Sequence, residues 1–404
     1  MTDVTALHGA LAATAEDRLV YDLDGIGDRC DELLRELPGI RVRFALKACP
    51  VDEVLGYLAE RGVGVDAAGP QEVAQALRAG VPVERIHYGS TVKSDQNIVH
   101  AHRLGIRDYA TDSLEDVRAV AAHAPGARVF CRLATTGDGA LWGLSEKFGC
   151  TPDDAVQLML EAAESGLVPA GLSVHVGSQQ MTADAWQDAF ADLAETMTAL
   201  GRRGLVLDHI NLGGGLPARG YADRHGTPLD PPLDKIFAVL RDGMQHLRDL
   251  HEDLDGHLHG GRLAFVVEPG RHLVADHGAV RARVVRLTRR RGPDGEQRNW
   301  LYLSVGRFNG LYETDALQYP LHFPEHPEHP EHSGRSDTEH VLARVAGPTC
   351  DSDDAFPGLV RVPKDLRSGD PVWVLSSGAY AASYMTRGFN GFAPLPHTCV
   401  GGRP

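Results

Sequence analysis

The chain has 404 residues, of which 43% are hydrophobic, so it can bury a large core and is expected to form more than one domain. The formal charge of -15 disfavours a nucleic-acid partner. No apolar run is long enough to cross a bilayer, and the polar start is no signal peptide, so we expect no membrane association. Six scattered cysteines without a CxxC pair indicate free thiols in a reducing cytoplasm rather than a disulfide framework or a zinc site.

The first part of the chain alternates between strand-like and helix-like stretches. A strand is expected at Leu19–Leu23, and eight further strand-like runs lie at residues 42–46, 63–66, 85–88, 107–110, 128–133, 170–174, 207–212 and 263–268. One helix between them has clear ends, with Thr151 as N-cap and a stop at Gly166, and another is expected from Pro70 to Gly80. Eight strands alternating with helices predict a TIM-like (β/α)8 barrel. An open doubly wound sheet is the alternative, but no GxGxxG sequence follows the first strand.

The pattern of apolar and polar residues changes after Arg271. Alternating β-type runs are expected at residues 280–287, 300–305, 340–345 and 371–375, with a turn-rich piece at 291–295. We therefore predict a barrel domain over residues 23–277 and an all-β domain, resembling a barrel or sandwich, formed by residues 1–22 with 278–404. A His/Pro/Glu tract at 322–332 is interpreted as a solvated loop, with incidental metal binding as the less favoured alternative.

A single lysine, Lys47, ends a short apolar run just before Pro50. It is either a lysine that keeps its charge in water at the edge of a core or a desolvated amine able to form a Schiff base with a carbonyl. The run itself does not decide between them. If the strand count holds, other polar or glycine-rich positions share the same end of the barrel, where barrel active sites are built. These are Asp66, Ser90, His175, Gly213 to Gly215 and Glu268.

Each of these motifs has a structural explanation beside the functional one. The glycines after the strand at 207–212 form either a tight turn or an anion-binding loop. His175 taken alone is more often a hydrogen-bonded core histidine. Glu268 ends an apolar strand and needs a cation or a proton donor, which is either Arg271 or a protonated pyridine nitrogen. Cys350 beside Asp351 is either part of an acidic turn or a proton donor next to an ammonium-binding carboxylate.

The order of these motifs is more specific than any one of them. The lysine after the first barrel strand, HVGSQ, GGG, EPGR, GPTCDS, GAY and FNGF follow one another along the chain. This combination resembles the fold-type III pyridoxal-phosphate decarboxylases, and most of all the ornithine/lysine decarboxylases. The likeness extends from Val20 to Phe392.

The resemblance implies pyridoxal 5'-phosphate as cofactor and no catalytic metal. Lys47 matches the lysine that holds the cofactor as an internal aldimine, His175 the histidine stacked over its ring, and Glu268 the acid paired with the ring nitrogen. The positions that match the phosphate cup are Ser178, Gly213, Gly214, Gly215, Gly270, Arg271 and Tyr380. Asp66 and Arg132 match residues that line the other side of the cofactor.

The resemblance also implies how the substrate is held. Cys350 matches the thiol that protonates the α-carbon after CO2 leaves, Asp351 the carboxylate that binds the distal ammonium, and Phe389 a wall of that pocket. In this family Cys350 and Asp351 enter the active site of the neighbouring subunit, so a homodimer with shared active sites is expected.

The expected reaction converts L-ornithine, or L-lysine, to the diamine and CO2, as in polyamine biosynthesis. Asp351, where diaminopimelate decarboxylases are expected to carry glutamate, favours this diamine-forming branch. The eukaryotic ornithine enzymes carry a second acidic contact after their counterpart of Gly306, and the segment 307–315 does not reveal that acid. Ser304 also stands where bacterial relatives usually show aspartate.

These departures leave the alternative of a decarboxylase for a modified amino acid in siderophore or natural-product biosynthesis. A non-catalytic regulatory relative is disfavoured because the lysine, the glutamate, the glycines and the cysteine are all present. An alanine-racemase-like enzyme is disfavoured because it would lack the GPTCDS element.

Overall fold

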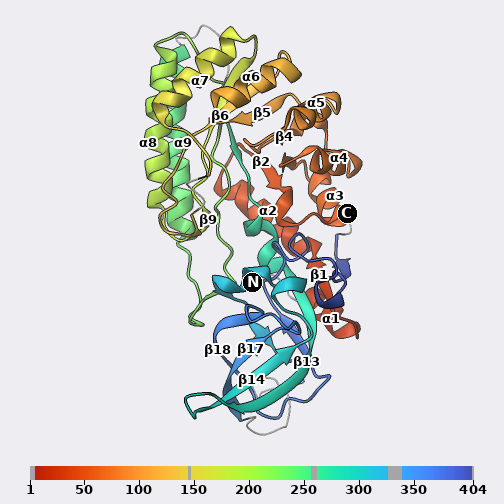
Figure 1. The fold of residues 1–404 in the computed structure, drawn as a ribbon. Coiled ribbons are helices and arrows are strands. Elements are labelled where there is room, and N and C mark those ends of the chain that lie inside the picture. Colours follow the sequence, from red (N-terminus) through yellow and green to blue (C-terminus); the bar gives the residue numbers. More distant parts are fainter. Residues whose placement is uncertain (1–4, 144–146, 256–261, 326–338, 403–404) are drawn as a thin grey trace. The chain divides into compact units, whose positions relative to one another are not determined.

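The computed structural model describes residues 5–143, 147–255, 262–325 and 339–402 and divides the chain into two compact units (Figure 1). The first, here called the barrel unit, comprises Arg29–Pro217 and Pro231–Gly270. The second, here called the β unit, comprises Met1–Asp28, Ala218–Asp230 and Arg271–Pro404.

Within the described part of the barrel unit, eight parallel strands close into a barrel in the order β10-β12-β2-β3-β4-β5-β6-β8. The strands are β2 (Ile40–Ala45), β3 (Gly64–Ala67), β4 (Ile86–Tyr88), β5 (Asp108–Thr111), β6 (Arg128–Arg132), β8 (Val168–Ser173), β10 (His209–Asn211) and β12 (Ala264–Val267). Each of the eight predicted runs overlaps one of them, so the predicted TIM-like barrel is confirmed. β7 (Ala140–Trp142) and β9 (Ser178–Gln180), which flank α7 and β8 in the sequence, form a separate two-stranded antiparallel sheet.

Amphipathic helices connect these strands and surround them (Figure 1). They are α2 (Leu23–Glu36), α3 (Asp52–Glu60), α4 (Pro70–Arg78), α5 (Asp95–Arg103), α6 (Leu114–His123), α7 (Pro152–Glu164), α8 (Asp184–Gly201) and α9 (Leu233–Asp255). The predicted start of α7 is confirmed: the Thr151 hydroxyl accepts the Asp154 N–H at 3.2 Å, and Pro152 occupies the first turn, where its missing N–H costs nothing. Within the described residues, no helix is both long and apolar enough to span a bilayer.

The β unit contains a curled, mostly antiparallel sheet in the order β16-β19-β13-β14-β17-β18. Its strands are β13 (Gly278–Arg291), β14 (Gln297–Leu303), β16 (Leu321–His322), β17 (His340–Ala346), β18 (Ala355–Pro363) and β19 (Pro371–Val374). Near the chain ends, β1 (Arg18–Asp22) pairs with β13 and with β20 (His397–Val400), while β11 (Ala222–Asp223) pairs with β15 (Leu317–Gln318). The short helices α1 (Thr5–Ala13) and α10 (Arg271–Val274) complete the unit. The predicted second, β-rich domain is confirmed, although it is mostly rather than wholly β.

The predicted solvated loop is wrong at its first residue, because His322 is part of a strand. His322 belongs to β16, and its ring packs 4.9 Å from that of Trp373 on the neighbouring strand. Residues 326–338, which contain the tract from residue 326 onward, lie outside the described residues. β18 was not predicted, because Pro357 and Gly358 inside it read as a turn.

Candidate active site

Lys47 projects from the carboxyl end of the first barrel strand. β2 ends at Ala45, and a single 3-10 turn over Leu46–Ala48 carries the lysine. Leu46 and Ala48 are fully buried, whereas the Lys47 side chain is half exposed, so the turn is anchored by its neighbours while the amine reaches out. Its Nζ lies 3.1 Å from Oδ2 of Asp66 on the next strand. The lysine is thus oriented by a buried acid at the barrel mouth.

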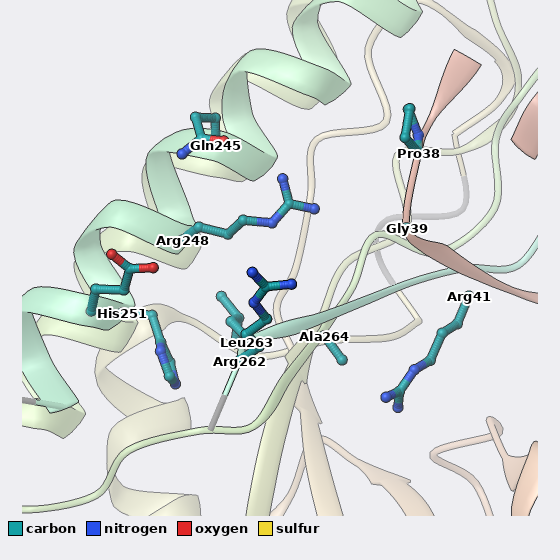
Figure 2. Close-up of a pocket in the computed structure, with 10 residues that line it drawn as sticks. Pro38, Gly39, Arg41, Gln245, Arg248, His251, Arg262, Leu263 and Ala264 are labelled. Atoms are coloured by element: carbon teal, nitrogen blue, oxygen red, sulfur yellow. The ribbon is translucent and has the colours of Figure 1, made fainter. Parts of the chain in front are cut away.

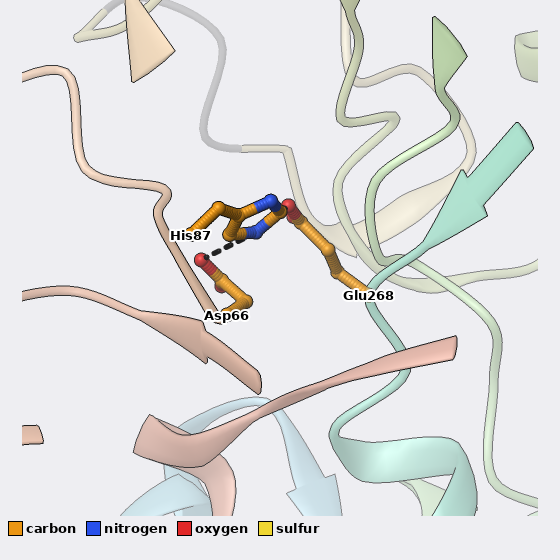
Figure 3. A group of neighbouring side chains, drawn as sticks. All are labelled: Asp66, His87 and Glu268. Carbon is orange, nitrogen blue, oxygen red and sulfur yellow. Dashed lines mark ion pairs between the residues drawn. The ribbon is translucent and has the colours of Figure 1, made fainter. Parts of the chain in front are cut away.

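Asp66 belongs to a group of three polar side chains in the barrel interior (Figure 3). Nε2 of His87 lies 2.8 Å from Oε1 of Glu268 and 3.3 Å from Oδ1 of Asp66. Burial raises the pKa of Asp66, but Lys47 and then His87 oppose this and hold the pKa below its ordinary value. Asp66 is therefore ionised at neutral pH.

Glu268 follows β12 and is fixed by a second neighbour. The side-chain amide of Asn211 donates to Oε1 of Glu268 at 2.5 Å, and the amide oxygen of Asn211 accepts the Gly213 N–H at 2.9 Å. One asparagine thus ties the buried acid to the glycine-rich turn after β10.

The glycine turn packs against His175. The Gly214 N–H donates to Nδ1 of His175 at 3.2 Å, and a Cβ on Gly214 would lie 3.0 Å from the Glu268 carbonyl and 3.1 Å from the histidine ring. Gly213 and Gly215 have φ of +66° and +109°, which other residues rarely adopt. Burial, followed by the charges of Arg132 and Lys47, lowers the pKa of His175 to about 3, so its ring is neutral.

The remaining predicted residues of the barrel unit end or follow barrel strands in the chain. Arg132 ends β6, and its guanidinium stands 4.8 Å from the centre of the Phe148 ring. Ser178 begins β9. A Cβ on Gly270 would lie 2.7 Å from that of Ala48, so this glycine permits close packing beside Lys47.

In the β unit, the side chains of Arg271 and Tyr380 are neighbours. The Arg271 guanidinium, 4% exposed, lies 4.8 Å from the centre of the Tyr380 ring. It also donates to both carboxylate oxygens of Glu313 at 2.6 Å and to the hydroxyl of Tyr221 at 3.1 Å. Glu313 was not predicted as a partner of this arginine.

Cys350, Asp351 and Phe389 occupy an exposed part of the β unit. The Cys350 N–H donates to the side-chain oxygen of Asn390, next to Phe389, at 3.1 Å. Asp351 accepts the Asp353 N–H at 2.8 Å, and the Phe389 ring lies 4.7 Å from that of Phe308. The unit thus exposes a thiol, an acid and an aromatic ring together.

A cavity of about 570 Å³ lies elsewhere in the barrel unit (Figure 2). Its lining includes Arg41, Arg248 and Arg262 and lies near the residues where β2 and β12 begin. It contains none of the predicted site residues, and barrel active sites are built at the opposite, carboxyl ends of the strands. This cavity is not the candidate active site.

Comparison with known proteins identifies the family. Residues 23–275 match the family described as pyridoxal-dependent decarboxylase, pyridoxal binding domain. The chain belongs to the pyridoxal-dependent decarboxylases. This decarboxylase is 28% identical to the lysine/ornithine decarboxylase of Selenomonas ruminantium over 381 residues, covering 94% of the chain and 88% of the relative. It is 29% identical to the ornithine decarboxylase of Caenorhabditis elegans over 393 residues, covering 94% and 86%. A lysine/ornithine decarboxylase from Vibrio vulnificus complexed with putrescine has a TM-score of 0.81 at 25% identity, covering 98% of both chains.

The decarboxylase is an amino-acid carboxy-lyase that uses pyridoxal 5'-phosphate. The residues present fit this cofactor. An amine suited to Schiff-base formation, a buried acid, a neutral histidine and a glycine turn with no room for side chains all lie at the strand ends of one barrel.

Three partners of the predicted residues were missed in the sequence. His87 lies within the predicted strand 85–88 as a polar residue between apolar ones, and Asn211 stands directly before the glycines. Both positions could have been noticed. Glu313 could not, because its partner Arg271 is 42 residues away.

Proposed function

We propose that this decarboxylase acts on L-ornithine, or on L-lysine, and releases the diamine and CO2. The observation that carries the proposal is the Lys47 amine, held 3.1 Å from Asp66 in the same barrel mouth as Glu268. The names of the relatives in Selenomonas, Caenorhabditis and Vibrio support these substrates.

In this proposal residues of the barrel unit bind the cofactor together with Arg271 and Tyr380. Lys47 would hold the aldehyde, His175 would stack on the ring, and Glu268 would pair with the ring nitrogen. The phosphate would be bound by the glycine turn with Ser178, Gly270, Arg271 and Tyr380, while Asp66 and Arg132 line the other side. When bound, pyridoxal 5'-phosphate supplies an electron sink for the charge left when CO2 departs.

The exposed residues of the β unit would serve the substrate. Cys350 would deliver a proton to the α-carbon, because a positioned thiol can act as a general acid. Asp351 would bind the distal ammonium, and Phe389 would line that pocket. We propose that they act in the partner's active site of a homodimer, with residues 23–277 as the cofactor domain and residues 1–22 with 278–404 as the β domain.

A second candidate substrate is a modified amino acid from siderophore or natural-product biosynthesis. Both acids in the segment 307–315 are already engaged: Glu313 with Arg271, and Asp315 with Arg307 at 3.6 Å. Asp351 is then left as the proposed ammonium ligand without help from this segment. A single carboxylate constrains the length and decoration of the substrate side chain less than two do.

A panel of amino acids, assayed by CO2 release, tests both candidates. Ornithine, lysine, arginine and diaminopimelate are compared with norvaline, which lacks the distal amine. We expect ornithine or lysine to be turned over with kcat/KM above about 10⁴ M⁻¹s⁻¹, the lower edge of ordinary enzymes. Cofactor bound to Lys47 together with no CO2 from any free diamino acid would exclude the first candidate and favour the second.

A further inference from the structure

His87 occupies a position that the family resemblance did not draw attention to. It lies on β4, is 1% exposed, and stands beside Asp66 in the register of β3 and β4. Its ring packs 5.1 Å from the ring of Phe130, inside the barrel. Nε2 points at two acids, Glu268 at 2.8 Å and Asp66 at 3.3 Å (Figure 3).

The chemistry of these contacts fixes one proton. Both atoms that face Nε2 are carboxylate oxygens, which can only accept when ionised, so Nε2 carries the hydrogen. Within the described residues, neither Nε2 of His87 nor Oδ1 of Asp66 has a hydrogen bond of good geometry, although both are buried. The His87 ring therefore lies between two acceptors and within ion-pair distance of both. A small rotation of the ring would align its N–H with either carboxylate.

The position of His87 is explained by the charges of its two acidic neighbours. Two carboxylates in a closed barrel repel each other unless a donor or cation lies between them. Burial and the nearby Arg43 guanidinium lower the pKa of His87, but the contacts with Asp66 and Glu268 oppose them, and the pKa is raised. The imidazole thus compensates both acids at once.

The geometry leaves one side of Glu268 open. Within the described part of the chain, the contacts of its carboxylate from Asn211 and His87 both go to Oε1. The second oxygen is then left to meet a partner from the barrel mouth.

We propose that His87 is a positioning residue for the cofactor: it holds the Glu268 side chain with one oxygen presented to the cofactor ring, and holds Asp66 where it orients Lys47. This inference rests on the proposed role of Glu268. His87 would touch neither the cofactor nor the substrate in this arrangement.

A metal ion is the competing explanation, since Asp66, His87 and Glu268 have donor atoms within 4.8 Å of one another. Two contacts disfavour it. The Lys47 ammonium lies on the other oxygen of Asp66, and Asn211 already donates to the Glu268 oxygen that a metal would share with His87. A cation placed there would face a positive charge and a hydrogen-bond donor.

The test measures the affinity of the apo-protein for pyridoxal 5'-phosphate, together with the visible spectrum of the loaded protein. We expect His87→Leu to weaken cofactor binding at least about tenfold and to change the spectrum, because the buried acids lose their donor. His87→Gln, whose amide can reach both carboxylates, should restore most of the affinity.

His209→Leu is the matched control. His209 is a buried barrel histidine that packs 5.5 Å from the same Phe130 ring, but its Nδ1 lies 2.9 Å from Asp208. It should lower the melting temperature without changing cofactor affinity. The proposal is overturned by wild-type affinity and spectrum in His87→Leu, by an equal loss of affinity in His209→Leu, or by a stoichiometric metal that only His87→Leu removes. Should His87→Leu fail to fold, wild-type binding by His87→Asn, whose amide is too short for both acids, overturns it equally.

The same experiment separates this inference from the proposed function. A Glu268→Gln, His87→Leu double variant should lose less cofactor affinity than the sum of the two single losses, since His87 acts in part through Glu268. A protein that binds the cofactor normally but decarboxylates no diamino acid refutes the substrate, not the role of His87. If the two losses of affinity add up fully in the double variant, the proposed role of His87 is refuted and the proposed substrate is not affected.

Discussion

The Lys47 ammonium lies 3.1 Å from the Asp66 carboxylate, which stands on the neighbouring strand of the barrel. Asp66 is 5% exposed, but half of the lysine side chain faces water. Solvent therefore screens the charge of Lys47. The ion pair contributes less to the free energy of folding than a fully buried pair at the same distance would. Its main consequence is that the amine is held at the barrel mouth.

Replacing Asp66 with asparagine is expected to alter acid stability. Although burial raises the pKa of Asp66, Lys47 and His87 outweigh it, and the folded-state pKa lies below the ordinary 3.8. The contribution of a group with a depressed pKa is present above its unfolded-state pKa and is lost as pH falls through the folded-state value. Urea unfolding should show Asp66→Asn less stable than wild type at pH 7, with the difference shrinking below about pH 4. A difference that stays constant with pH would contradict this.

His175→Phe should make the protein less sensitive to mild acid. Burial, followed by Arg132 and Lys47, lowers the pKa of His175 from 6.5 to about 3, so protonation favours the unfolded chain between these values. Wild type then loses up to about 1.4 kcal/mol per pH unit within that window, and phenylalanine removes this loss. The free energy of unfolding measured between pH 7 and pH 4 checks it. Parallel pH profiles for the two proteins would show that His175 is not the source.

Mixing two inactive variants tests the shared active site. Lys47→Ala removes the proposed cofactor lysine, and Cys350→Ala removes the proposed proton donor. If each active site takes these residues from different subunits, an equal mixture that exchanges subunits should recover about one quarter of wild-type activity, because half the dimers carry one intact site. No recovery despite demonstrated subunit exchange would place both residues in one subunit's site.

Glu313→Gln is expected to destabilise the β unit strongly. It leaves the buried Arg271 guanidinium without a charged partner, and breaking a buried ion pair in this way costs about 3–5 kcal/mol. Asp315→Asn is the control, since its pair with Arg307 is partly exposed and should cost less than about 1 kcal/mol. Urea denaturation measures the free energy of unfolding of both variants. Equal effects of the two changes would be inconsistent with a buried, compensated arginine.

Gly214→Ala should impair cofactor binding with a smaller effect on folding. The added methyl group would lie 3.0 Å from the Glu268 carbonyl and 3.1 Å from the His175 ring, which must move apart to admit it. Gly56→Ala, in the middle of α3 with its nearest neighbour at 3.9 Å, should instead stabilise the protein by about 0.5–1 kcal/mol. Titration with pyridoxal 5'-phosphate and thermal melting compare the two. Unchanged cofactor affinity in Gly214→Ala would remove this turn from the proposed binding site.

The barrel could be predicted because its signals are local. Alternation of apolar runs with capped helices, such as the Thr151 start of α7, depends on neighbours in sequence. The polar residues at strand ends follow from the same count, since parallel strands in a barrel all end at one face. Lys47, Asp66 and Glu268 were therefore expected together before any contact between them was known.

The polar contacts inside the barrel and within the β unit could not be predicted in this way. His87 meets Glu268 across the barrel interior, and Arg271 meets Glu313 through the tertiary fold. No sequence spacing encodes such pairs. β18 was missed because of a local signal. The Pro357-Gly358 pair favours a turn, but pairing with β17 overrides this preference.

One pairing in the β unit bears on how the chain is synthesised. β1 forms a parallel ladder with β20, so that Leu19 stands beside His397. Every strand of the barrel has been synthesised once residue 267 is made, whereas the edge of β1 waits for nearly the last residues of the chain. We predict that the barrel acquires protease resistance on nascent chains well before β1 does, and that chains ending ahead of His397 keep an open strand edge prone to self-association. Proteolysis of stalled nascent chains of increasing length would reveal the order.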